Sequence, residues 1–359
     1  MARPRRTSSA RDVPASACLQ TGWPNWVDRA PETQLRAIVR SGQIGHAYLL
    51  SGPKGVGKSA LAHAFAQSIC CGEPDAGDLS QPCGVCRSCR NIARGSHPDV
   101  EEFNLATQAA LAEKPGRGAT LTIDTVRRIR ANAALFPLES SRRILLVDDA
   151  ETLQEPAQQA LLKTLEEPPS AVTIVLIADE AESLLATVRS RCREIVVRPV
   201  SEPEVVRALL DDGADEALAQ EVAALGRGRP AWARDAVANP RLLAIRRQEQ
   251  EAARVWVGSP PYDRLVTAFK LGEQYGKRRD DVVGTVQAAI QVLRESMFRA
   301  AGAAGGEPPA PSVASTASEL GRGIAASLTC LSDLEANVRP RLALETMVLS
   351  WPNLELRSQ

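Results

Sequence analysis

The fold of this chain is decided by the stretch Ala47-Tyr48-Leu49-Leu50-Ser51-Gly52-Pro53-Lys54-Gly55-Val56-Gly57-Lys58-Ser59. Its first part is a short apolar run of the kind that forms a buried strand, and its last part matches the pattern Gly-x4-Gly-Lys-Ser in full. In that pattern glycines let backbone N–H groups approach phosphate oxygens closely, where a strand passes into a helix. The stretch therefore predicts a strand, a phosphate-binding loop (P-loop) and a helix in direct succession.

This loop supplies most of the candidate nucleotide-binding residues. Lys58 offers a positive charge to the β- and γ-phosphates, and Ser59 offers a hydroxyl to Mg²⁺, so ATP and Mg²⁺ are the expected ligands. The alternatives are a glycine-rich turn that merely opens a helix, or a relic loop that no longer binds. The candidates are Gly52, Gly55, Val56, Gly57, Lys58, Ser59 and, from a later strand, Asp148.

Two carboxylates follow the apolar run 143–147. Asp148 is expected near Mg²⁺, at the edge of the sheet where open α/β folds bind ligands. An ATPase of this kind usually has glutamate at the second position to orient the attacking water. Asp149 is one methylene shorter, and a misplacement of about an ångström can cost ~10²-fold in rate. Asp149 is therefore interpreted as a degenerate water-orienting residue.

Four cysteines, Cys71, Cys83, Cys86 and Cys89, supply enough thiolates to close a tetrahedral zinc shell. Because no position stays open for substrate, the zinc would be structural. The insert 70–95 has too little apolar content to fold alone, and metal binding can stabilise such a module. Two alternatives stay open: reduced cysteines without metal, and Cys70 in place of Cys71 as the first ligand. The spacing suits a reducing cytoplasm better than a disulfide framework.

Composition excludes several classes of protein. The chain has 359 residues with 43 basic and 43 acidic side chains, so no strong overall charge attracts nucleic acid. The longest apolar stretch, 171–178, is far shorter than the roughly 20 residues that span a bilayer, so no membrane segment is expected.

Four arginines within the first eleven residues, with no apolar run after them, indicate a disordered basic tail over 1–20.

Alternating apolar and helical patterns organise the chain. Strands are expected at 47–51, 100–103, 144–148, 172–178 and 194–197, with helices at 58–69, 124–135 and 156–166 among them, which predicts a three-layer α/β domain with a mainly parallel sheet over 21–198. Ser201 and Glu204 form a capping box that begins a new helix and marks a boundary. A small helical domain is expected over 199–241, and an all-helical domain, interrupted by a Gly/Pro/Ala loop at 301–312, over 242–359.

Taken together, several motifs occur in the order seen in one family. They are the P-loop, the four-cysteine insert, Gly95-Ser96-His97-Pro98-Asp99, Val147-Asp148-Asp149-Ala150-Glu151, the run Ala160 to Pro169, and Ser190-Arg191-Cys192. The set resembles the AAA+ clamp-loader subunits of bacterial DNA polymerase III, strongly over about 40–200, and 334–345 resembles the family's C-terminal ending.

The resemblance implies an AAA+ ATPase-type domain, a helical lid and a helical collar through which five subunits form an open ring. Motor (gamma/tau) and delta subunits, the sliding clamp and primer-template DNA held through the ring would be the partners, in the cytoplasm. Arg191 would be an arginine finger that reaches the nucleotide of a neighbouring subunit, where a guanidinium can be worth ~10³-fold or more.

Departures from the family's motor subunit favour the delta-prime type, which would form part of the polymerase holoenzyme and bind ATP with weak or no hydrolysis of its own. The motor's polar sensor falls near Ala178 and Asp179 here, and Ala231 stands at its second sensor arginine, for which Arg229 or Arg234 could substitute. Two other readings stay open. One is a self-sufficient P-loop ATPase, either a gamma/tau-type motor or another enzyme, and the other is a zinc-stabilised module with a dead P-loop.

Overall fold

The computed structural model describes residues 22–73, 78–111, 120–169, 171–276, 278–301, 316–336 and 338–352. The chain divides into two compact units, Met1–Asn239 and Pro240–Gln359. The tail expected over 1–20 and all but the first residue of the loop expected over 301–312 lie outside the described residues. Within the described residues, no helix combines the length and apolar character needed to cross a bilayer.

The first unit is built on a five-stranded sheet in the order β2-β3-β4-β1-β5. Its strands are β1 (Ala47–Ser51), β2 (Val100–Phe103), β3 (Arg143–Val147), β4 (Val172–Ala178) and β5 (Arg193–Val196). Each pairing is parallel, which confirms the predicted α/β fold class. β3 begins one residue earlier than expected because Arg143, although charged, donates its N–H to Ala171 O at 2.7 Å and is buried in the fold.

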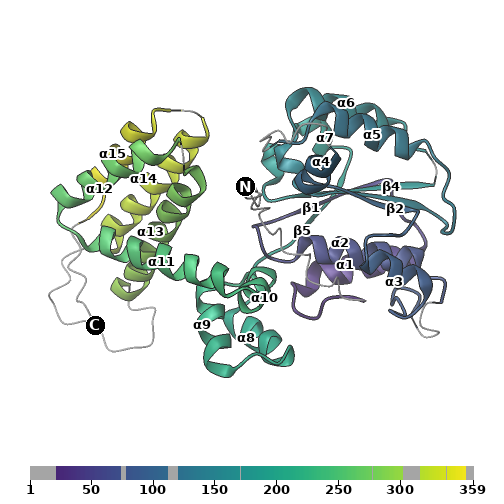
Figure 1. Ribbon diagram of the computed structural model, residues 1–359, viewed down its shortest axis with the longest axis horizontal. Coiled ribbons are helices and arrows are strands. Elements are labelled where there is room, and N and C mark those ends of the chain that lie inside the picture. The colour runs from purple at the N-terminus through teal and green to yellow at the C-terminus, as the bar shows by residue number, and fades with distance from the viewer. Residues whose placement is uncertain are drawn as a thin grey trace, which may run out of the picture. The chain divides into compact units, whose positions relative to one another are not determined.

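Helices cover both faces of this sheet (Figure 1). On one face lie α1 (Arg29–Ser41), α2 (Lys58–Cys70) and α3 (Arg87–Ala93), and on the other α4 (Leu105–Leu111), α5 (Ile123–Ala133), α6 (Glu155–Glu166) and α7 (Ala186–Arg189). Two short 3₁₀ turns, η1 (Ala150–Thr152) and η2 (Ala181–Ser183), follow β3 and β4. Alternate strand residues face opposite ways. Leu49 thus packs in the core under α5 and α6, whereas its neighbour Leu50 packs in the core under α1 and α2.

Three short helices follow β5: α8 (Glu202–Asp211), α9 (Glu216–Gly226) and α10 (Pro230–Ala238). The predicted capping box is present at the start of α8, where the Ser201 N–H donates to Glu204 Oε2 at 2.9 Å. The three helices contact one another and form a small helical group within the first unit.

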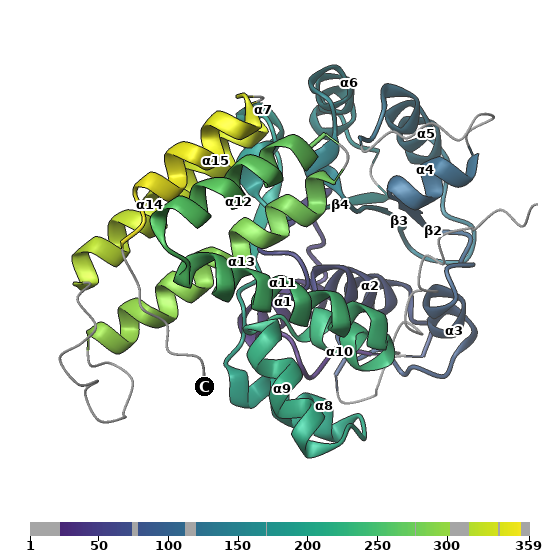
Figure 2. The ribbon, with the colours of Figure 1, turned by 60° about the vertical axis from the view of Figure 1, so that its left-hand side comes forward.

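In the second unit the described secondary structure is helical throughout. Its helices are α11 (Pro240–Gly258), α12 (Pro261–Gln274), α13 (Arg279–Ala300), α14 (Ala317–Glu335) and α15 (Pro340–Leu349). α13 packs against α11 and α14, and α15 packs against α12 and α14 (Figure 2). Trp256 and Trp351 meet edge to face in the core of this bundle, with ring centroids 4.8 Å apart.

Candidate nucleotide site and cysteine cluster

The P-loop leaves the carboxyl end of β1 and opens α2, as its sequence predicts. Two of its glycines, Gly52 and Gly57, have the least room for a side chain. A Cβ on Gly52 would lie 2.0 Å from Val197 O, and one on Gly57 would lie 2.5 Å from Val27 Cγ1. Both also adopt positive φ angles, +143° and +102°, which L-residues with side chains rarely reach. Both positions therefore require glycine, as the P-loop pattern does.

Lys58, the lysine of the motif, is buried with a side-chain exposure of 6%. Its ammonium donates to Gly52 O at 2.5 Å, to Pro53 O at 3.1 Å and to Asp179 Oδ1 at 2.7 Å. An ammonium has three N–H donors, so all three have acceptors. The pairing with Asp179 links residues that are 121 positions apart in the chain.

Ser59 and Asp148 meet at the first turn of α2, where the Ser59 hydroxyl donates to Asp148 Oδ2 at 2.5 Å. Burial raises the pKa of the Asp148 carboxyl above its usual range, against the opposing effect of the Ser59 hydrogen bond. A hydroxyl and a carboxylate side by side are the oxygen ligands that Mg²⁺ takes in P-loop proteins. The donor set thus fits the cation expected from the sequence.

Asp149 is positioned differently from its neighbour. It is one of two non-glycine residues with a positive φ, 56°, in the described part of the chain. Its carboxylate accepts the Leu105 N–H at 3.3 Å, and its own N–H donates to Asp148 Oδ1 at 2.9 Å. The Asp149 carboxylate is therefore tethered to the start of α4, at the end of β2.

A partly buried contact between His63 and Glu102 beside this site was not predicted from the sequence. His63 Nε2 lies 3.2 Å from Glu102 Oε2, and His63 Nδ1 lies 2.7 Å from Ser59 O. Burial lowers the pKa of His63, but the contacts with Glu102 outweigh it and the net pKa is raised. His63 stands one helical turn after Ser59, so its position next to the site could have been inferred. Its partner on β2 could not, because it depends on tertiary structure.

The helical group α8–α10 touches the P-loop directly. Gly55 O accepts the N–H groups of Ala231 at 3.0 Å and Trp232 at 3.2 Å. A Cβ on Gly55 would lie 2.8 Å from Trp232 Cβ, so the two backbones are close-packed. The start of α10 is thereby fixed against the loop that would hold phosphate.

The two arginines considered as substitutes for a second sensor are engaged elsewhere. Arg234 forms an ion pair with Asp212 at 3.0 Å, and its guanidinium lies over the Trp26 ring at 4.8 Å. Arg229 donates from Nε to Gly226 O at 2.9 Å.

Arg191 lies just after α7 and is partly exposed. Its guanidinium forms an ion pair with Glu166 Oε1 at 2.6 Å and donates to Thr187 O at 2.8 Å. The structure thus brings Lys58, Ser59 and Asp148 to one edge of the sheet, whereas Arg191 pairs with a carboxylate at the end of α6.

The four predicted cysteines form one cluster: Cys71 directly follows α2, Cys83 and Cys86 precede α3, and Cys89 lies in α3. Their sulfur atoms all lie within 4.8 Å of one another, with Cys71 Sγ 3.6 Å from Cys83 Sγ and 3.9 Å from Cys86 Sγ. Tetrahedral zinc with Zn–S bonds of about 2.3 Å requires sulfur separations of about 3.8 Å, so the cluster fits the metal. The group includes Cys71 and not Cys70, whose pKa is raised to about 12 by burial.

Backbone groups favour a thiolate at Cys86, whereas burial raises the pKa of Cys71 and of Cys89. The N–H of Cys86 points to Cys83 Sγ at 3.2 Å and that of Cys89 to Cys86 Sγ at 3.4 Å. Burial acts to raise the pKa of Cys86, but hydrogen bonds led by the Cys89 N–H lower it to about 7.

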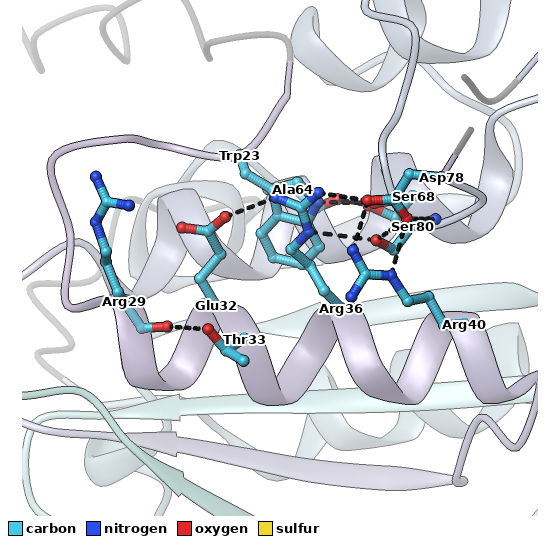
Figure 3. Close-up of polar contacts among 10 residues, drawn as sticks. All are labelled: Trp23, Arg29, Glu32, Thr33, Arg36, Arg40, Ala64, Ser68, Asp78 and Ser80. Carbon is cyan, nitrogen blue, oxygen red and sulfur yellow. Dashed lines mark hydrogen bonds and ion pairs between the residues drawn. The ribbon is translucent and has the colours of Figure 1, made fainter. Parts of the chain in front are cut away.

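The insert is fastened to α1 by polar contacts (Figure 3). Asp78 accepts from Arg36 and Arg40, each at 2.6 Å, and Ser80 O accepts from Trp23 Nε1 at 2.8 Å. The guanidinium of Arg40, followed by Ser80 and Arg36, holds the pKa of the Asp78 carboxyl below its usual range. These contacts tie the segment after Cys71 to α1 and to Trp23, which precedes α1.

Comparison with known proteins identifies similar chains. The DNA polymerase III delta subunit family matches residues 28–201. The delta' subunit of Pseudomonas aeruginosa is 38% identical over 192 residues, which cover 52% of this chain and 54% of that protein. The delta' subunit of Escherichia coli is 34% identical over 51% of each chain. The gamma/tau subunit of Mycobacterium bovis is 34% identical over 49% of this chain and 28% of its own length.

The matched region is therefore about half of this chain and about half of each delta' relative. Among solved structures, a gamma subunit-related protein of Thermotoga maritima aligns over 89% of this chain at 17% identity with a TM-score of 0.43. That similarity is too low to bear on function, and the assignment rests on the sequence matches.

Proposed function

The chain belongs to the bacterial DNA polymerase III clamp-loader family, and from that premise we propose that it is a delta-prime-type subunit. In this role it binds ATP at the P-loop, hydrolyses it weakly or not at all, and supplies Arg191 to ATP bound by a neighbouring motor subunit. The proposal concerns the assembled ring, with gamma/tau and delta subunits, the sliding clamp and primer-template DNA as partners.

The observation that carries this proposal is a contrast between the P-loop, which keeps its phosphate-binding motif, and the water-orienting position, which does not keep a glutamate. The P-loop keeps its glycines at Gly52 and Gly57, where a side chain would clash, and Ser59 with Asp148 fits Mg²⁺. The position that would orient water carries Asp149, whose shorter side chain is tethered to the Leu105 N–H. Such a site is suited to holding nucleotide and poorly suited to hydrolysing it.

ATP with Mg²⁺ and the zinc ion would bind at separate sites. Lys58, Ser59 and Asp148 would hold ATP with Mg²⁺, and the metal would neutralise phosphate charge. Cys71, Cys83, Cys86 and Cys89 would hold one zinc ion with no open position, so zinc would support the fold of the insert and take no part in chemistry.

Arg191 is suited to act on a neighbour. Its present partner is Glu166, and the exposed fractions of the two side chains are 34% and 49%. An ion pair at such an exposed position is worth only about 0–1 kcal/mol, so the guanidinium is easily released. In the transition state of phosphoryl transfer its planar fork would offset charge on the γ-phosphate.

The regions outside the P-loop domain would serve assembly. We assign 199–241 to the lid, whose α10 contacts Gly55, and 242–359 to the collar that joins subunits into the ring. DNA contact would be shared through the ring, because the chain carries 43 basic and 43 acidic side chains and has no net positive charge.

A motor gamma/tau-type ATPase is the second candidate, because the gamma/tau relative is as similar to this chain as the E. coli delta' relative is, at 34% identity. ATP binding and steady-state hydrolysis by the purified chain separate the two. The delta-prime role predicts binding with slow turnover, whereas turnover comparable to that of a complete motor ATPase would establish the second candidate. Absence of binding would indicate a zinc-stabilised module with a dead P-loop.

A further inference from the structure

Asp179 occupies the position from which a side chain can reach the phosphate loop. It directly follows β4, the neighbour of β1 in the sheet, and the last register pair of the two strands is Ser51 with Ala178. Its backbone N–H is held by Glu151 Oε2 at 3.2 Å. Its carboxylate turns to the P-loop and forms the ion pair with Lys58 at 2.7 Å.

We propose that Asp179 is a specificity-determining residue of the nucleotide site, whose carboxylate competes with phosphate for Lys58 and disfavours a nucleoside triphosphate more than a diphosphate. This inference rests on the proposed function, because it requires that the loop binds nucleotide.

The competition follows from the donors of Lys58. Its three N–H groups are used by two loop carbonyls and the Asp179 carboxylate. A phosphate oxygen can bond to the ammonium only by replacing one of these acceptors. Since the loop carbonyls are fixed by the backbone, Asp179 is the acceptor that can move, and 35% of its side chain is exposed.

Displacement of Asp179 is opposed by its surroundings. Other carboxylates crowd the same edge of the sheet, among them Asp148, Asp149 and Glu151, and the charge of Asp179 contributes, after burial, to the raised pKa of Glu151. A carboxylate close to phosphate repels it. The lysine of a P-loop reaches the β- and γ-phosphates, so the additional charge of the γ-phosphate is the part that Asp179 opposes most.

The test measures the dissociation constants of ATP and of ADP, each with Mg²⁺, by isothermal titration calorimetry on the full-length protein. Asp179→Asn removes the charge and keeps the shape of the side chain, and Asp179→Ala serves as a second variant. Glu180→Gln is the matched control, because it removes the same charge from the exposed neighbouring residue. Zinc content and circular dichroism show that each variant is folded.

We expect Asp179→Asn to bind ATP about tenfold or more tightly than the natural chain and to gain less for ADP, as the loss of a close like charge predicts. Glu180→Gln should change either constant by less than about twofold, because it is exposed to solvent. If the natural chain binds no ATP but the Asp179 variants do, the inference about Asp179 is supported. In that case the proposed ATP binding by the natural chain is wrong.

Two results overturn the inference in distinguishable ways. If the natural chain and both variants bind ATP with the same affinity, Asp179 has no such role and the proposed nucleotide binding stands. If none of the three binds ATP or ADP, removing the carboxylate has not opened the site, and the proposed nucleotide binding is wrong as well.

Discussion

Among single residues, Lys58 bears most directly on nucleotide binding. Its removal takes away a charge-assisted contact with phosphate, so Lys58→Ala should weaken ATP binding by about tenfold or more. Lys163→Ala removes the same charge from an exposed position on α6 and is the control. Calorimetric titration with ATP checks both variants, and zinc content shows that they stay folded. Equal affinity of Lys58→Ala and the natural chain would refute binding at this loop.

Asp99 has a structural role. It belongs to the motif Gly95-Ser96-His97-Pro98-Asp99, which the sequence links to the clamp-loader family only by resemblance. Its side chain is buried and accepts the N–H groups of Leu138, Glu139 and Ser140 at 2.6, 2.7 and 2.8 Å. Burial acts to raise its pKa, but these hydrogen bonds outweigh burial and place the pKa below the usual range. The ionised carboxylate therefore fixes the loop that precedes β3.

Asp99→Asn should lower the free energy of unfolding by about 2–4 kcal/mol at pH 7, because buried N–H groups lose a charged acceptor. In the natural chain the folded pKa lies below the unfolded value of about 3.9, so this stabilisation is present above pH ~4 and is lost as pH falls through the folded pKa. Urea unfolding at several pH values checks this. The difference in unfolding free energy between the variant and the natural chain should become smaller in acid. A difference that does not change with pH would contradict the proposed role of the Asp99 carboxylate. Asp124→Asn, exposed on α5, is the control.

The sequence predicts those candidate site residues whose positions follow from a local motif. Lys58, Ser59 and Asp148 belong to motifs that carry their own geometry. The ion pair of Lys58 with Asp179 and the contact of His63 with Glu102 were not predicted, because they depend on which strands are neighbours in the sheet. The sequence places Asp179 near the motor's polar sensor position, and its bond to Lys58 appears in the structure alone.

At the scale of elements, the cysteine insert depends on its metal. Purified protein should contain about one zinc per chain, and Cys86→Ser should release it and loosen 71–95, because four thiolates are needed to close the shell. Elemental analysis and hydrogen exchange of this segment are the measurements. Cys330→Ser, in α14 and outside the cluster, should keep the zinc. A folded natural protein without zinc would contradict the assignment.

Strands and the P-loop helix could be predicted because buried apolar runs have few alternatives, whereas some element ends could not. The helix expected over 124–135 ends at Ala133. Leu135 continues the apolar pattern but is 54% exposed, and Phe136 precedes a proline, which disfavours helical backbone. The apolar sequence pattern thus extends to Leu135, beyond the last helical residue that is buried against the sheet.

For the whole molecule, relatives and sequence agree on the family and leave the type of subunit open. The matches to delta' and to gamma/tau proteins cover about half of this chain, and the family match over residues 28–201 includes the P-loop. Asp149 and Asp179 are the residues that favour a subunit with little turnover of its own. The role proposed for this chain is therefore to supply Arg191 to a neighbouring subunit.

The measurement that tests this claim most directly is ATP hydrolysis by a reconstituted ring of this chain with gamma/tau and delta subunits, in the presence of the clamp and primed DNA. Arg191→Ala should lower the stimulated rate by about tenfold or more, and Arg191→Lys should restore little, because an ammonium lacks the planar fork. Arg193→Ala, an exposed arginine two residues away, should retain the natural rate. If rings carrying Arg191→Ala hydrolyse ATP and load clamps at the natural rate, Arg191 is not a finger and the central claim is wrong.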